Sequence, residues 1–221
     1  MNLDLSKRII TSLSLLFILY VSLFLNEFLW IYLLIVTSII SFYEFNNLIN
    51  KIYKRNKKKI YLFNLISFLY LSFFVFTTYN IYRTSVFILL FIILICIFSD
   101  TGGYVIGKLI GGKKLTKISP KKTVSGSIGS FIFSLFPVLI LVNQKIINFE
   151  FVDHKIISLI LICLFLSLIC QLGDLFISFF KRKAKAKDTG TILPGHGGLL
   201  DRIDGFIFVL PLSFILIELI Y

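Results

Sequence analysis

Long uninterrupted apolar runs are the feature that most constrains how this chain folds. Each run is close to the ~20 residues that a helix needs to cross a hydrocarbon core about 30 Å thick. The composition agrees, because 57% of the 221 residues are hydrophobic and only 15% are charged, whereas a soluble domain is about one-quarter charged. Backbone amides in lipid must be satisfied within their own segment, so the runs predict helices. We therefore expect an all-α, polytopic integral membrane protein.

Seven apolar ranges are predicted to span the membrane. They are 9–25, 28–49, 60–79, 86–107, 127–143, 156–180 and 205–221. If the N-terminus lies inside and the spans alternate, 20 of the 23 lysines and arginines fall on the inner side, as the positive-inside rule predicts. We expect N-terminal transmembrane helices in 1–85 and a catalytic transmembrane region in 86–221, with cytoplasmic loops 108–126 and 181–204.

The net charge of +12 is therefore assigned to one face of the membrane. Attraction to anionic lipids, at about 1 kcal/mol per cation near the surface, is the favoured interpretation of the basic segment 51–59. Nucleic acid is not an expected partner, because the cations are divided among loops and the aromatic residues lie in the spans. Cys96, Cys163 and Cys170 also lie in the spans, and we expect them to be buried and free of disulfides.

One segment between the last two predicted spans differs from the other loops. Residues 178–204 combine cations, carboxylates and glycines, the groups that a metal–polyphosphate site at a membrane surface requires. Asp201 and Asp204 are three residues apart, so they project from one helical face. The alternative is that they only complement a helix dipole. His196 lies between glycines, and a phosphate contact or a general-acid role is favoured over zinc binding.

Asp174, Asp100 and Glu44 lie within the predicted spans. Asp174 lies about six residues before the inner end of its span, which is roughly 9 Å along a helix, so it should face a cavity or a partner such as Lys181. Together with Asp201 from another helix, it would form a hard oxygen site suited to Mg²⁺. Asp100 fits a functional role and a helix cap or kink equally well. Glu44 is expected to snorkel to the interface rather than to act in function.

A second loop, 109–130, places lysines and hydroxyls directly before a predicted span. Such groups, together with free amides at a helix N-terminus, form an anion site. The spacing of a P-loop is absent. Gly102, Gly103 and Gly107, which lie just before this loop, have partial small-xxx-small spacing. Two interpretations are open: a role in the glycine-rich, charged site, and close helix packing.

Together these residues resemble the CDP-diacylglycerol synthase (phosphatidate cytidylyltransferase) family. The positions that match its signature are Ser178, Lys181, Arg182, Lys187, Asp188, Gly190, Pro194, His196, Gly197, Gly198, Asp201, Arg202, Ile203 and Asp204. The stretches that begin at Asp100, Ser119 and Gly173 also resemble the family. Ile177 and Ser125 stand where the family usually has glutamate.

The resemblance implies transfer of a cytidylyl group from CTP to phosphatidate, with release of pyrophosphate. The implied catalytic residues are Asp174, Lys187, Asp188, His196, Asp201, Arg202 and Asp204. The implied substrate-binding residues are Asp100, Lys121, Lys122, Thr123, Ser178, Lys181, Arg182, Gly197 and Gly198. Asp174 and Asp201 are expected to bind Mg²⁺. The resemblance leaves open whether a second, monovalent ion also binds and whether the protein forms a homodimer. The expected location is the inner (plasma) membrane, with the active site on the cytoplasmic face.

Three alternatives remain open from the sequence alone. The nearest is a related CTP-dependent membrane lipid kinase or cytidylyltransferase that acts on another lipid. The second is an ion-binding transporter in which Asp100 and Asp174 form midplane sites, although the acids gather near one face and no half-to-half symmetry is visible. The third is a catalytically silent membrane scaffold.

Overall fold

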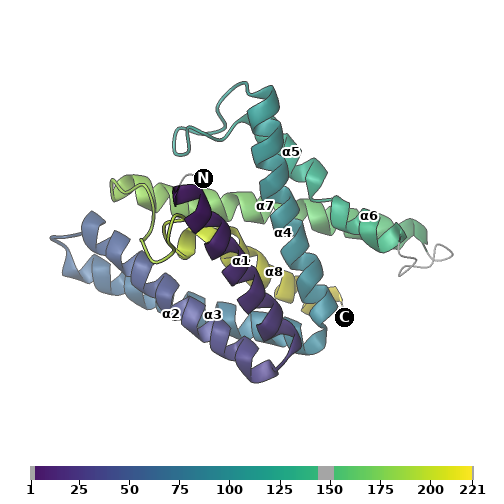
Figure 1. Ribbon diagram of the computed structural model, residues 1–221, viewed down its shortest axis with the longest axis horizontal. Coiled ribbons are helices and arrows are strands. Elements are labelled where there is room, and N and C mark those ends of the chain that lie inside the picture. The colour runs from purple at the N-terminus through teal and green to yellow at the C-terminus, as the bar shows by residue number, and fades with distance from the viewer. Residues whose placement is uncertain (1–2, 144–151, 221) are drawn as a thin grey trace. The chain divides into compact units, whose positions relative to one another are not determined.

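The computed structural model describes residues 3–143 and 152–220, and these residues form helices joined by loops (Figure 1). Within this part of the chain no strand forms beyond isolated bridges, so the predicted all-α class is confirmed. The chain divides into two compact units. The first unit comprises Met1–Val86 and Phe179–Asp204, and the second comprises Phe87–Ser178 and Gly205–Tyr221.

The first unit is built on three helices. They are α1 (Leu3–Phe24), α2 (Glu27–Ile52) and α3 (Lys57–Thr84). Asn26 and Asn56 directly precede α2 and α3. Each side-chain oxygen accepts a hydrogen bond from a backbone amide of the first turn, as N-cap residues do. α2 packs against both α1 and α3, and Figure 1 shows α2 and α3 side by side as a helical hairpin.

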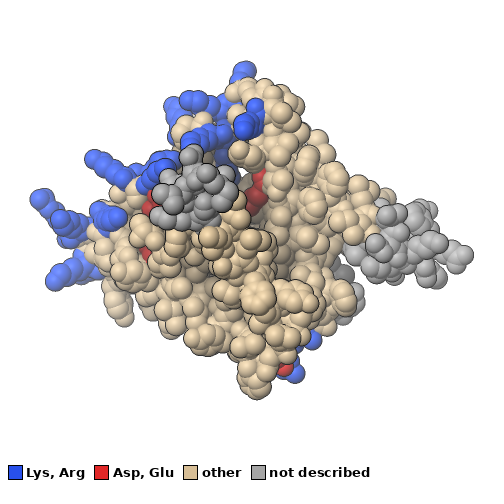
Figure 2. Space-filling model, viewed as in Figure 1, with Lys and Arg blue, Asp and Glu red and all other residues tan. Residues whose placement is uncertain are grey.

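The turn of this hairpin carries a dense group of cations. The exposed members are Lys51, Lys54, Arg55, Lys57, Lys58 and Lys59. Figure 2 shows lysine and arginine side chains gathered at this end of the hairpin. Such a group is suited to the surface of an anionic membrane.

The second unit contains the remaining helices, two of which it shares with the first unit. They are α4 (Val86–Ile110), α5 (Val124–Phe133), α6 (Phe136–Asn143), α7 (Val152–Lys183) and α8 (Leu200–Ile220). The end of α7, from Phe179, and the start of α8, up to Asp204, belong to the first unit. The predicted signature segment therefore lies mainly in the first unit.

Six of the seven predicted spans lie along single helices, apart from Leu25 and Tyr221 at their ends, and Tyr221 is outside the described residues. The prediction of one helix over 127–143 is wrong, because the structure divides this range into α5 and α6. The cause is Pro137, which lacks an amide hydrogen and whose ring would collide with the carbonyl group four residues earlier, at Phe133.

Among the described residues, four helical segments are long and apolar enough to cross a membrane by length and composition. They are Glu27–Ile52, Lys57–Thr84, Val86–Ile110 and Ile157–Lys183. These segments identify a membrane protein. The count of seven spans and the inside position of the N-terminus stay predictions.

The glycines of α4 pack directly against the glycines of α5. A Cβ atom on Gly129 would lie 2.7 Å from the carbonyl oxygen of Gly102, and one on Gly126 would lie 2.8 Å from that of Gly103. Gly107 also lies against Gly126. Close helix packing, one of the two interpretations of this glycine spacing, is therefore confirmed. The approach brings the first turns of α5 next to the end of α4.

Candidate functional site

The loop between α4 and α5 folds back on itself. α4 ends at Ile110, and the next residues are Gly111 and Gly112. Their φ angles of 64° and 101° lie in the region that glycine adopts without steric cost. The two ends of the loop then pair, since the amide of Leu115 donates to the carbonyl oxygen of Lys122 over 2.8 Å. This pairing delivers Lys122 to the start of α5.

The N-terminus of α5 is closed by hydroxyl groups. Thr123 is the N-cap residue, and its Oγ1 accepts a hydrogen bond from the amide of Gly126 over 3.0 Å. The hydroxyl of Ser125 lies 3.0 Å from that of Thr123 and donates to the carbonyl oxygen of Gly111. Ser125 therefore ties α5 to the residue that follows α4.

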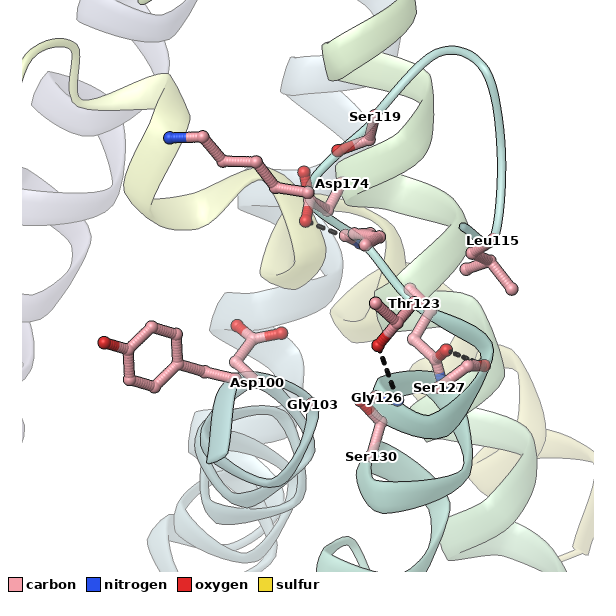
Figure 3. A pocket seen from close by; sticks show the side chains of 13 residues that line it. Asp100, Gly103, Leu115, Ser119, Thr123, Gly126, Ser127, Ser130 and Asp174 are labelled. Atoms are coloured by element: carbon pink, nitrogen blue, oxygen red, sulfur yellow. Dashed lines mark hydrogen bonds and ion pairs between the residues drawn. The ribbon is translucent and has the colours of Figure 1, made fainter. Parts of the chain in front are cut away.

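A cavity of about 330 Å³ opens beside this turn, lined by α4, the loop, α5 and α7. Five residues predicted from the sequence line it together: Asp100, Lys121, Lys122, Thr123 and Asp174. Figure 3 shows the carboxylates of Asp100 and Asp174 directed towards the same space. The second unit by itself therefore combines two lysines, two carboxylates and the N-terminus of a helix around one cavity.

Asp174 is the best-connected acid of this cavity. Its Oδ2 lies 2.6 Å from Nζ of Lys122, and both side chains are about one-third exposed or less, at 31% and 27%. Its Oδ1 accepts a hydrogen bond from Ser178, one turn later on α7, over 3.1 Å. Each carboxylate oxygen offers about two acceptor positions, so both oxygens keep capacity for a ligand. The partner considered from the sequence, Lys181, pairs with Asp201 instead.

Hydrogen bonds between polar side chains join α7 to α5 and to α4. Ser127 donates to Oε1 of Gln171 over 2.6 Å, and Gln171 is 8% exposed. Within the same unit, Ser99 of α4 and Ser167 of α7 lie 2.8 Å apart. A paired polar group inside a helical bundle costs little, whereas an unpaired one is expensive. These bonds therefore hold the cavity walls in register.

The oxygen groups of the cavity suit a magnesium ion. Mg²⁺ is usually held by one or two carboxylates and completed by phosphate oxygens and water, and Asp100 and Asp174 supply two carboxylates on one cavity. In the described part of the chain, no group of three or more His, Cys, Asp or Glu side chains is placed to hold a metal ion. Asp201 belongs to the other unit, so the expected pairing of Asp174 with Asp201 at one metal stays a prediction.

Asp201 lies in the first turn of α8 and is surrounded by donors. Its Oδ1 lies 2.6 Å from Nζ of Lys181, and the two side chains are only 7% and 14% exposed. Its Oδ2 accepts from the amide and the hydroxyl of Thr189, over 2.7 and 3.0 Å, and from the amide of Gly198 over 3.3 Å. Asp201 therefore holds together the end of α7, the α7–α8 loop (residues 184–199) and the start of α8.

Glu44 of α2 is a second buried carboxylate in this unit, and it was missed as a site residue. It is 1% exposed and accepts hydrogen bonds from the amides of Leu199 and Leu200, over 3.0 and 2.9 Å, and from the hydroxyl of Thr189 over 2.8 Å. The expectation that Glu44 snorkels to the interface is therefore wrong. Burial is possible because backbone amides and a hydroxyl compensate the carboxylate.

One signal in the sequence pointed to the burial of Glu44. It follows Ser41 by three residues and precedes Leu48 by four, so the three share one helical face, and both neighbours are buried. The signal was hidden because α2 is apolar on nearly all sides, and a helix without a polar face does not reveal which side packs inwards.

His196 lies in a tight turn that several bonds hold in place. The amide of Leu193 donates to the carbonyl oxygen of Gly197 over 2.9 Å, and Arg202 donates to the carbonyl oxygen of His196 over 2.8 Å. The Nε2 atom of His196 lies 3.4 Å from the hydroxyl of Ser12 on α1. The turn is therefore well defined, and the chemical role of the imidazole stays a prediction.

The other predicted site residues lie in the first unit, in the α7–α8 loop or beside it. Lys187, Asp188 and Arg182 are exposed, and Asp204 is half-buried. A Cβ atom on Gly197, whose φ is 87°, would lie 3.1 Å from the Asp188 side chain, so that position favours glycine for both strain and space. The roles of these residues stay predictions.

The long apolar helices, and a cavity that combines lysines, hydroxyls and carboxylates, define a polytopic membrane protein with groups suited to a phosphate-bearing ligand. More particularly, the chain belongs to the cytidylyltransferase family, whose model matches residues 51–220. The resemblance stated from the sequence is thereby confirmed.

Relatives with known names match the chain over part of its length. It is 48% identical over 132 residues to a phosphatidate cytidylyltransferase of Staphylococcus saprophyticus, a match that covers 58% of this chain and 48% of the relative. It is 46% identical over 122 residues to a phosphatidate cytidylyltransferase of Bacillus subtilis, covering 55% and 44%. The chain spans about half the length of the curated relatives that it matches.

Proposed function

We propose that this protein is a phosphatidate cytidylyltransferase, which converts CTP and phosphatidate to CDP-diacylglycerol and pyrophosphate. The observation that carries the proposal is the cavity of the second unit, where Lys121, Lys122, Thr123, Asp100 and Asp174 surround one space. The names of the relatives support it, because those proteins are phosphatidate cytidylyltransferases.

The reaction places modest chemical demands on the protein. A phosphate oxygen of phosphatidate forms a bond to the α-phosphorus of CTP, and the bond from that phosphorus to the oxygen bridging to the β-phosphate breaks. Pyrophosphate leaves with the electron pair. The attacking phosphate is already ionised at neutral pH, so no strong base is needed. Alignment and neutralisation of charge are then the main contributions of the protein.

The side chains of the cavity divide these tasks. Lys121 and Lys122 bind phosphate oxygens of CTP, and they lie beside the N-terminus of α5, where the helix dipole favours an anion. Lys122 pairs with Asp174, and it can exchange this partner for a phosphate. Asp174, with Asp201 as the second proposed ligand and Asp100 nearby in the cavity, would hold Mg²⁺, which neutralises phosphate charge when bound.

The membrane location suits this substrate. The acyl chains of phosphatidate remain in the hydrocarbon layer while its phosphate reaches the polar loops. We place the active site on the cytoplasmic face of the plasma membrane, because that face carries the predicted excess of cations. The exposed cations of 51–59 would attract anionic lipids, the substrate among them.

One assay with two labels tests the reaction. The purified full-length protein receives phosphatidate, Mg²⁺ and CTP labelled at either the α- or the γ-phosphorus. A cytidylyltransferase transfers the α-label to the lipid fraction and releases the γ-label as pyrophosphate. A lipid kinase would transfer the γ-label to lipid, and that result, or no labelled lipid from protein that binds CTP, would reject the proposal.

A further inference from the structure

The hydrogen bonds of Glu44 all lead to the signature segment. Its carboxylate is buried in the first unit, at 1% exposure, and its three donors are the amides of Leu199 and Leu200 and the hydroxyl of Thr189. These donors follow Glu44 in the chain by 145 to 156 residues. A carboxylate on α2 therefore fixes a loop that is remote in sequence.

The loop is shaped around this carboxylate. A Cβ atom added to Gly190 would collide with the Glu44 carboxylate, and one added to Gly198 would lie 2.6 Å from its Oε2. Real Cβ atoms do not approach so closely. Two glycines of the signature therefore allow the backbone to reach Glu44, which links their identity to a residue outside the signature.

Thr189 joins Glu44 to Asp201. Its Oγ1 lies 2.8 Å from Oε2 of Glu44 and 3.0 Å from Oδ2 of Asp201. A hydroxyl has one hydrogen, so it donates to one of these carboxylates at a time. Its position is nevertheless set by both, and a change at Glu44 is transmitted to Asp201 through one side chain.

Glu44 also performs the function of an N-cap for α8. Leu199 and Leu200 carry amides of the kind left without a partner at the start of a helix. An N-cap residue normally lies directly before its own helix, whereas this cap comes from α2. The start of α8, with Asp201 as its second residue, is thereby fixed to α2 rather than only to its own loop.

We infer that Glu44 is a positioning residue: it holds Thr189 and the first amides of α8 so that Asp201 keeps its place in the signature segment. Glu44 precedes residue 51, where the family match begins. The effect expected on turnover rests on the proposed function, whereas the effect expected on the loop does not.

The test compares two substitutions on one helix in the full-length protein. Glu44→Gln keeps the shape of the side chain but replaces one acceptor oxygen by a donor that opposes the bound amides. Glu27→Gln is the matched control, because Glu27 also lies on α2 but is exposed and pairs with Arg83. Thr189→Val, which removes only the linking hydroxyl, serves as the second variant if Glu44→Gln does not fold.

Hydrogen exchange of the loop is the first measurement. We expect peptides that cover 189–201 to exchange about tenfold faster, or more, in Glu44→Gln, since a charge-assisted hydrogen bond is lost. Thr189→Val should show a smaller change in the same peptides. Peptides of α3, and all peptides of Glu27→Gln, should exchange as in the native protein.

Turnover is the second measurement. In an active native protein, Glu44→Gln should lower kcat with little change in the KM for CTP, because the lysines of the second unit are untouched. Unchanged loop exchange, an equal rise across every helix, or native turnover despite a loosened loop would each overturn the inference. If the native protein makes no CDP-lipid, the proposed function fails, and the anchoring of the loop is decided by exchange alone.

Discussion

Asp174 and Asp201 are each bound to a lysine, but their surroundings differ. The Lys122–Asp174 pair is partly exposed, so the pair itself adds only about 0–1 kcal/mol to stability. The Lys181–Asp201 pair is almost buried, and Asp201 also accepts three hydrogen bonds from the loop. The first pair is suited to exchange partners with a ligand, and the second to hold structure.

A change of metal preference tests the proposed magnesium ligands. Asp174→Cys and Asp201→Cys replace a hard carboxylate by a soft thiolate, which favours Cd²⁺ over Mg²⁺. We expect each variant to lose turnover with Mg²⁺ and to regain part of it with Cd²⁺, measured as CDP-lipid formed.

Glu218→Cys, an exposed position at the end of α8, is the control and should retain its dependence on Mg²⁺. Rescue of Asp174→Cys but not of a folded Asp201→Cys would remove Asp201 from the metal site. Asp201 would then be a residue that only holds the loop.

The buried pair allows a prediction about stability. Lys181→Met leaves Asp201 charged and without its cation, which costs about 3–5 kcal/mol when one partner of a buried pair is removed. We expect a clear fall in the free energy of unfolding, measured by denaturant titration in detergent. Lys183→Met is the control, because Lys183 is exposed near the end of the same helix, and it should change little. Equal stability of the two variants would mean that the Lys181–Asp201 pair contributes nothing.

The sequence predicted several residues that line the cavity, but not how they are connected. Asp174, Lys122 and Thr123 could be chosen because acids within apolar runs and lysines before a helix start are unusual. The pairing of Asp174 with Lys122 rather than Lys181 could not be predicted from the sequence. It depends on how the loop between α4 and α5 folds back on itself. The hydrogen bonds of Glu44 could not be predicted either, because two of its donors are backbone amides, which every residue except proline possesses.

Among the helices, the contact between α4 and α5 sets the width of the cavity. The two helices approach at their glycines, so the cavity residues of α4 and of the α5 turn lie near one another. Without side chains at these positions, the helices gain close backbone packing, on which membrane bundles depend. The distance between α4 and α5 is therefore part of the site.

Gly129→Val should separate these two helices. A Cβ atom at Gly129 would lie 2.5 Å from Cβ of Ile106, and overpacking of this kind typically costs about 1–3 kcal/mol. We expect a lower melting temperature and weaker CTP binding, measured by thermal unfolding and by titration with nucleotide. Ile128→Val, at an exposed position one residue earlier, should alter neither. Native affinity in Gly129→Val would show that the cavity tolerates a wider spacing.

The helices themselves were largely predictable, with one instructive failure. Long apolar runs determine most boundaries to within a few residues, because a membrane helix requires its length and composition. The break between α5 and α6 was missed because the range 127–143 contains no charged residue, and its apolar pattern continues past Pro137. Proline within a predicted helix is also present in α8, at Pro211, where the helix continues, so proline alone does not decide the outcome.

For the whole molecule, the distribution of charge predicts the orientation in the membrane. Cysteine placed at Lys54, in the α2–α3 turn, should react with an impermeant thiol reagent only from the cytoplasmic side. Cysteine at Arg83, at the end of α3, should react only from outside. Both positions are exposed, and the native cysteines are buried, so background labelling should be low. Labelling of both positions from one side would contradict the predicted orientation.

The acceptor that Glu44 provides has a practical consequence for protein engineering. A shortened chain that starts at residue 51 would keep every position matched by the family, but it would leave the amides of Leu199 and Leu200 without the carboxylate that they bind. A chimera that borrows its N-terminal helices from another homologue would need an acid at the same depth. The helices ahead of the matched segment are thus not an interchangeable membrane anchor.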